Sequence, residues 1–238
     1  MDGRRLMWLG LTLLDWVALA WFLLAWFGYT RMADDLSAKG GGGLNQRLQV
    51  LRRRWAVAMM ARDNRIVDAQ LIGHSIHSAT FFASTTILII AGLVGAFGGV
   101  EAVHRMLAES GLAVDTTRAV LELKLLALLA VYAYGFIKFT WSIRQFNYLC
   151  VLIGAVPEGA ASTSESRARH AEGVVGVLSL ASHSYNAGLR SYYFALAMLG
   201  WFFHPGLFLF ATAWAAGVLL WRQTRSPTLK AISDLARE

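Results

Sequence analysis

Asp15 is the residue whose type and position most clearly suggest chemistry, because it lies inside an apolar run from residue 6 to residue 29. A carboxylate near the middle of a membrane helix costs roughly 2.5–3.5 kcal/mol on insertion scales, so it must face protein, water or a partner. This predicts either an ion or proton site at Asp15, or a structural ion pair or helix–helix hydrogen bond. The natural partner is Lys138, inside a later apolar run.

Lys138 belongs to a polar and aromatic stripe with helical spacing, made of Tyr134, Lys138, Trp141, Gln145 and Tyr148. If this stripe meets Asp15, the two charges neutralise each other. Otherwise the ammonium either lines a cavity that attracts anions or extends to the cytoplasmic interface near Arg144. The candidates for an ion pathway or a buried ion pair are therefore Asp15, Lys138, Tyr134 and Gln145.

Three arginines are candidates for a basic rim at the cytoplasmic face: Arg62, Arg65 and Arg190. Rings of basic residues favour anions in oligomeric pores. The alternative for Arg190, near the start of an apolar helix, is an anchor to lipid phosphate.

Histidines offer a weaker signal, because His74 and His77 share one helix face and His183 could add a third nitrogen. Zinc sites need at least three protein ligands, so the alternative is capping or interfacial hydrogen bonding. We find no complete ligand set and no nucleophile–base motif in the sequence. No catalytic residue is predicted, no cofactor is required, and His204 beside Pro205 is expected to cap a turn.

Composition places these residues in a membrane protein. Of the 238 residues, 56% are hydrophobic and only 16% are charged, whereas soluble domains average roughly 45–50% and about 25%. A soluble enzyme, a disordered chain and a disulfide-stapled domain are therefore excluded. The net charge of +7 comes from basic residues beside apolar runs, which predicts contact with anionic lipid at the cytoplasmic face and no nucleic-acid partner.

The elements that must position these residues form one all-α polytopic membrane bundle. We expect about five spans, at 6–29, 73–98, 121–143, 186–203 and 206–222. The third is bracketed by Lys124 and Arg144. A cytoplasmic amphipathic helix at 44–72 follows a glycine tether, and a flexible loop is expected at 157–173.

The number of spans depends on Pro205 and Gly206, which interrupt the last apolar run. A helical hairpin there gives five spans, and one kinked helix gives four. Five spans with the N-terminus outside place sixteen basic residues on the cytoplasmic side and four outside, against twelve and eight for four spans. The positive-inside rule favours five spans in a bacterial inner membrane.

Three blocks of sequence resemble the domain-of-unknown-function family 599, multipass membrane proteins of bacteria and plants. The blocks are Asp15-Trp16; Arg53-Arg54-Trp55 with Asn64-Arg65-Ile66-Val67-Asp68 and Phe81-Phe82-Ala83-Ser84-Thr85-Thr86; and Asn186, Gly188, Arg190 and Tyr192-Tyr193-Phe194. His74 and His77 interrupt the second block, where less titratable residues are expected. The resemblance spans nearly the whole chain and implies a multispanning fold but no activity.

Small residues such as Gly92, Gly95 and Gly99 favour close helix association, so a homo-oligomer is expected. The first functional hypothesis is a channel or transporter for small ions, with anions favoured by the basic rim. The second is a non-transporting scaffold or assembly factor, in which buried charges only fix the helix register. The third is a metal or haem protein that uses the histidines.

Overall fold

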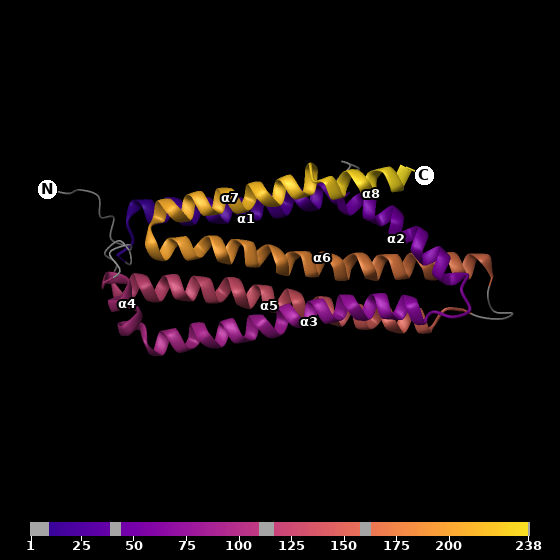
Figure 1. The fold of residues 1–238 in the computed structure, drawn as a ribbon, viewed down its shortest axis with the longest axis horizontal. Helices are drawn as coiled ribbons and strands as arrows, with labels where there is room; N and C mark the ends of the chain where they lie inside the picture. The colour runs from indigo at the N-terminus through magenta and orange to yellow at the C-terminus, as the bar shows by residue number, and fades with distance from the viewer. Residues whose placement is uncertain (1–9, 39–43, 110–116, 158–162, 238) are drawn as a thin grey trace. The chain divides into compact units, whose positions relative to one another are not determined.

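The computed structural model describes residues 10–38, 44–109, 117–157 and 163–237, and the regular structure in these ranges is helical (Figure 1). In chain order the helices are α1 (Leu13–Ala38), α2 (Leu44–Met60), α3 (Ile66–Gly98), α4 (Val100–Glu109), α5 (Arg118–Gly154), α6 (Ser164–Phe203), α7 (Pro205–Thr224) and α8 (Pro227–Arg237). They contribute to two compact units. Unit 1 contains Met1–Asp34, Thr86–Gly135 and Leu189–Arg222; unit 2 contains Asp35–Thr85, Phe136–Gly188 and Gln223–Glu238.

Four helical stretches in the described part of the chain are long and apolar enough to cross a membrane: Leu13–Ala33, Ile66–Gly98, Arg118–Gly154 and Pro205–Ala236. The prediction of an all-α polytopic membrane bundle is confirmed, and the chain is an integral membrane protein. The expected span 186–203 is not among the four. It forms the end of α6, where Asn186 and Arg190 lower the mean hydropathy, so the five-span arrangement stays a prediction.

The start of α1 corrects the prediction that Asp15 lies near the middle of a membrane helix. The helix begins at Leu13, and Asp15 occupies its first turn. Gly10 precedes it with a φ of 75°, a left-handed conformation that only glycine adopts readily. Thr12 then caps the helix through its side chain. Residues 6–9 of the expected span lie outside the described residues.

The prediction of one continuous amphipathic helix at 44–72 is wrong. This stretch is divided into α2 and the beginning of α3 by a non-helical segment at 61–65. The side-chain carbonyl of Asn64 accepts a 2.9 Å hydrogen bond from the Ile66 amide and so caps the new helix. As a result, α3 begins before residue 73, where the second span was expected. The predicted glycine tether at 39–43 lies outside the described residues.

The expected loop at 157–173 is also corrected, because α6 begins at Ser164. The Thr163 hydroxyl accepts a 3.1 Å hydrogen bond from the Ser166 amide, which caps the helix. Beyond this cap, Ala171 and Val174 are buried in the unit 2 core, and this packing stabilises the first turns. Residues 158–162 lie outside the described part of the chain.

The chain reverses between α6 and α7 (Figure 1). The imidazole Nδ1 of His204 accepts a 2.9 Å hydrogen bond from the Gly206 amide, so the prediction that His204 caps a turn is confirmed. Beside the turn, the ring of Trp201 stacks on that of Phe208 with centroids 5.2 Å apart. This stacking holds the two helices together within unit 1.

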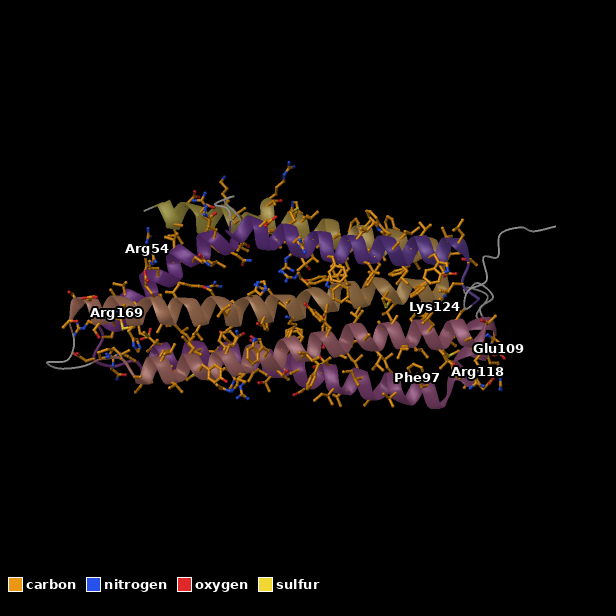
Figure 2. All side chains as sticks on the ribbon, turned by 180° about the vertical axis from the view of Figure 1, so that it is seen from behind. Arg54, Phe97, Glu109, Arg118, Lys124 and Arg169 are labelled. Atoms are coloured by element: carbon orange, nitrogen blue, oxygen red, sulfur yellow. The ribbon has the colours of Figure 1, made fainter. Side chains whose placement is uncertain are left out.

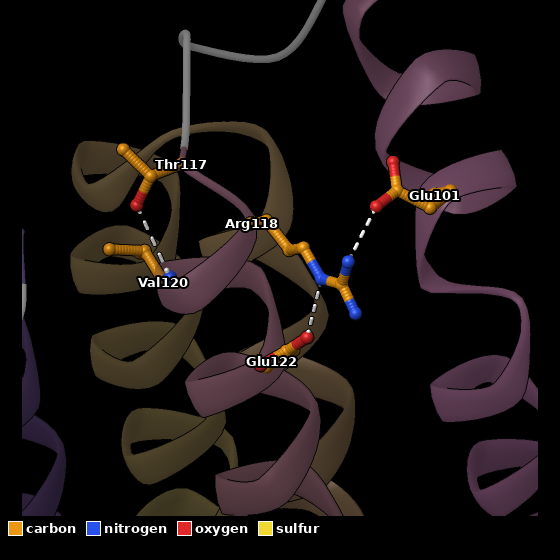
Figure 3. Close-up of polar contacts among 5 residues, drawn as sticks. All are labelled: Glu101, Thr117, Arg118, Val120 and Glu122. Carbon is orange, nitrogen blue, oxygen red and sulfur yellow. Dashed lines mark hydrogen bonds and ion pairs between the residues drawn. The ribbon is translucent and has the colours of Figure 1, made fainter.

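A bridged corner joins α4 to α5 in unit 1, and sequence patterns did not predict α4. Arg118 donates hydrogen bonds to Glu101 of α4 at 2.6 Å and to Glu122 of α5 at 2.8 Å (Figure 3). The Thr117 hydroxyl accepts a 3.4 Å hydrogen bond from the Val120 amide at the start of α5. These exposed contacts fix the entry into α5, whose next turns carry the site described below.

A close helix contact defines the core of unit 2. Gly188 of α6 lies so near the ring of Phe139 in α5 that an added Cβ would come within 2.7–2.8 Å of three ring atoms. Phe139 in turn stacks on Phe82 of α3 at a centroid distance of 5.4 Å. A glycine at position 188 is therefore required by the approach of α5 and α6.

Candidate functional site

Asp15 is buried in unit 1, with 5% of its surface exposed, and three groups donate hydrogen bonds to its carboxylate. Its Oδ2 accepts from the Thr12 amide at 3.0 Å and from the Thr12 hydroxyl at 2.6 Å. Its Oδ1 accepts from the indole Nε1 of Trp201 at 2.7 Å. Because the Asp15 amide also donates to the Thr12 hydroxyl at 3.2 Å, the two residues form a capping box at the start of α1.

Lys124 is a buried cation of the same unit, with 4% of its surface exposed. Its ammonium donates a 2.7 Å hydrogen bond to the backbone carbonyl of Trp201 and lies 5.5 Å from the centroid of that indole ring. The carbonyl belongs to the last turn of α6, where carbonyls lack a helical partner and the helix dipole favours a cation. Lys124 therefore caps α6 (labelled in Figure 2).

We call Asp15, Lys124 and Trp201 the Trp201 cluster. Trp201 is 1% exposed and is the largest fully buried side chain among the described residues. Its side chain donates to the carboxylate while its backbone accepts from the ammonium. The cluster thus joins the starts of α1 and α5 to the end of α6. An anionic and a cationic side chain both hydrogen-bond to Trp201.

The other predicted pathway residues, Tyr134, Gln145 and Lys138, are described within their own units. Tyr134 of unit 1 contacts Trp26 edge to face, with centroids 5.6 Å apart. Gln145 of unit 2 is buried, and its side-chain carbonyl accepts a 2.8 Å hydrogen bond from the Ser184 hydroxyl. Lys138 is half-buried in the unit 2 part of α5. Within unit 1, Asp15 and Lys124 share Trp201 as a hydrogen-bond partner. A pairing of Asp15 with Lys138 stays a prediction.

The predicted basic rim divides between the two units. Arg62 and Arg65 belong to unit 2, where Arg62 is exposed and Arg65 is half-buried. Arg190 belongs to unit 1 and is 7% exposed, so it is not part of an exposed basic surface there. A rim that combines the three arginines stays a prediction.

Arg62 instead contributes to a carboxylate site that we call the Asp68 cluster (Trp55, Arg62 and Asp68). Asp68 has no exposed surface, and its Oδ1 accepts hydrogen bonds from the Arg62 guanidinium and from Trp55 Nε1, the latter at 2.8 Å. Its Oδ2 is buried with no hydrogen-bond partner among the described residues. The cluster links α2 to the first turn of α3 across the break at 61–65.

The arginines of α2 add further contacts inside unit 2. Burial lowers the pKa of the Arg52 guanidinium, which donates a 3.4 Å hydrogen bond to the Ser179 hydroxyl of α6. Arg54 donates to the backbone carbonyl of Leu235 at 2.9 Å and so caps the end of α8 (Arg54 is labelled in Figure 2). The basic helix therefore holds α6 and α8 as well as α3.

The candidate metal ligands His74, His77 and His183 are all exposed side chains of unit 2. Among the described residues, no three histidine, cysteine or acidic side chains gather in an arrangement that could hold a metal ion. A metal site made by one chain is therefore not formed in the described ranges.

Sequence reasoning missed Lys124 and Trp201 as site residues. The sequence pattern places Lys124 at the start of a span. A lysine among four leucines between positions 121 and 126 is itself a signal of a sheltered charge. Trp201 gave no separate signal, because it stands in an aromatic run with two phenylalanines. Its partner at position 15 could not be inferred without the fold.

The bundle and its buried charges define an integral membrane protein that spans the bilayer several times. The chain matches the family model described as "Protein of unknown function, DUF599" over residues 17–228. It therefore belongs to this family, and the suspected resemblance is confirmed. The chain has no significant match among curated proteins or among solved structures.

Proposed function

We propose that the protein is a non-transporting membrane scaffold, whose buried charges hold helices together rather than conduct ions. The observation that carries this proposal is the Trp201 cluster. Asp15 accepts three hydrogen bonds and caps α1, while Lys124 caps α6. Charges engaged in this way supply the register of a bundle, as buried polar groups do in other helical assemblies.

The proposal includes a location and partners. The chain resides in a bacterial inner membrane with its N-terminus outside, which places the arginines of α2 in the cytoplasm beside anionic lipid. It forms a homo-oligomer. Support comes from Gly92 and Gly95, which are exposed in unit 1 and would have open space around an added Cβ. Such surfaces allow a second helix to approach closely.

Ion passage is the second candidate, because ionisable residues buried within a membrane protein mark ion pathways in many transporters. Asp15 and Lys124 are such residues in unit 1. In this function, the anions favoured by the basic residues would cross the bilayer.

Ion flux into proteoliposomes separates the two functions, measured for the parent chain, Asp15→Asn and Lys138→Met. The scaffold proposal expects the flux of the parent to equal that of empty liposomes, and a single membrane partner to copurify at fixed stoichiometry. Asp15→Asn should lower the melting temperature in detergent. One result would overturn the scaffold proposal and support ion passage. The parent chain would show a flux, and Asp15→Asn or Lys138→Met would change that flux without altering the melting temperature.

A further inference from the structure

A surface groove of about 700 Å³ runs along the unit 2 part of α5. Its lining combines three kinds of side chain: apolar, aromatic and polar. The seven residues are Ile137, Thr140, Trp141, Ile143, Arg144, Asn147 and Tyr148. A groove of this size and mixed lining is suited to an amphipathic ligand.

The polar end of the groove is organised around Arg144. Its Nε donates a 2.6 Å hydrogen bond to the Tyr148 hydroxyl, and its guanidinium lies 5.7 Å from the centroid of the same ring. This contact orients the side chain and leaves its two terminal nitrogens as further donors. A planar guanidinium matches the oxygens of a phosphate in a bidentate arrangement.

The other end of the groove is apolar and open. Ile137 is 62% exposed and Trp141 is 49% exposed. Tryptophan and tyrosine are enriched where a membrane meets water, and Arg144 directly follows the third span expected from sequence, 121–143. The groove therefore combines a cation and two interfacial aromatics with apolar surface suited to an acyl chain.

The positive charge of the groove distinguishes two possible occupants, a second copy of this chain and an anionic ligand. Among the seven lining residues, Arg144 carries a positive charge and none is acidic. A second copy that packed through this same face would bring two Arg144 side chains together, since a two-fold contact pairs a surface with itself. An anionic ligand instead compensates the charge.

We propose that this groove binds an anionic phospholipid, with the phosphate on Arg144 and Asn147 and an acyl chain along Trp141 and Ile137. This inference rests on the proposed partnership with anionic lipid and assigns it a specific place. The arginines of α2 are not required for it. Arg53, for example, already pairs with Glu172 at 2.9 Å.

The test measures lipid binding to the purified full chain in a neutral detergent. The probes are phosphatidylglycerol and phosphatidylcholine with brominated acyl chains, which quench nearby tryptophans, and inorganic phosphate as the competitor. The variants are Arg144→Gln, Arg144→Lys and Trp141→Phe. Arg53→Gln serves as a matched control, because it removes an exposed arginine of the same unit.

We expect saturable quenching by phosphatidylglycerol, at least fivefold weaker binding of phosphatidylcholine, and loss of the saturable part of the quenching in Trp141→Phe. Arg144→Gln should weaken binding at least fivefold, whereas Arg144→Lys should retain part of it and Arg53→Gln nearly all. Equal losses in Arg144→Gln and Arg53→Gln would overturn the site in favour of general charge attraction. Full displacement by inorganic phosphate would assign the groove to a soluble anion and overturn the lipid proposal. Because ion flux and partner stoichiometry do not enter this assay, its failure is distinct from failure of the scaffold function.

Discussion

The indole nitrogen of Trp201 lies 2.7 Å from the carboxylate of Asp15, although the two residues are 186 positions apart in the sequence. Both side chains are buried in unit 1. The contact closes the bundle between its first helix and the end of α6. Its contribution to the stability of unit 1 can be measured by substitutions in the Trp201 cluster.

Replacing Asp15 by Ala should destabilise the protein by about 1–3 kcal/mol, because a buried indole N–H loses its acceptor, and by about 1 kcal/mol more through loss of the helix cap. Thermal unfolding in detergent measures the effect. Asp63→Ala is the matched control, since Asp63 is exposed. Equal melting temperatures for the two variants would contradict a structural role for Asp15.

Replacing Lys124 by Met should cost about 1–3 kcal/mol, because the buried Trp201 carbonyl loses its hydrogen-bond donor and the end of α6 loses its cap. The double variant Asp15→Asn/Lys124→Met should lose less stability than the sum of the two single variants. A double-mutant cycle on unfolding free energies measures this coupling. Strict additivity would show that the two charges do not interact.

Gly188→Ala should destabilise unit 2 by about 1–3 kcal/mol, because the added methyl would overlap the ring of Phe139. A second substitution, Phe139→Leu, should recover part of the loss by opening space. The control is Gly176→Ala in the same helix, where an added Cβ meets nothing within 4 Å. That variant should gain about 1 kcal/mol from helix propensity. Unfolding monitored by circular dichroism distinguishes the pair, and equal effects would contradict the close contact.

Asp68→Ala should loosen the junction of α2 and α3, because Trp55 and Arg62 lose their shared acceptor. We expect faster proteolysis and faster amide exchange across residues 61–65, at a cost of about 1–3 kcal/mol. Mass spectrometry after timed digestion measures the rate. Unchanged cleavage relative to the parent would show that the Asp68 cluster does not hold this junction.

Composition and apolar run length were sufficient to predict a helical membrane protein, because the bilayer imposes a span of known length. The predicted ends of individual helices were wrong where capping residues start a helix. Thr163 starts a helix where glycine, serine and charged residues suggested a loop, and Asn64 restarts one inside a continuous amphipathic pattern. The contact of Asp15 with Trp201 could not be predicted from the sequence, because the two residues lie 186 positions apart and only the packing of unit 1 brings them together.

The two hydrogen bonds at Trp201 also bear on biosynthesis. The ribosome makes Asp15 and Lys124 long before it makes Trp201, so each enters the translocation machinery without its final partner. A nascent chain stopped before α6 would keep the Thr12 contacts of Asp15 but would lack its Trp201 donor and the carbonyl acceptor of Lys124. We therefore expect unit 1 to reach its full stability only after α6 has been made.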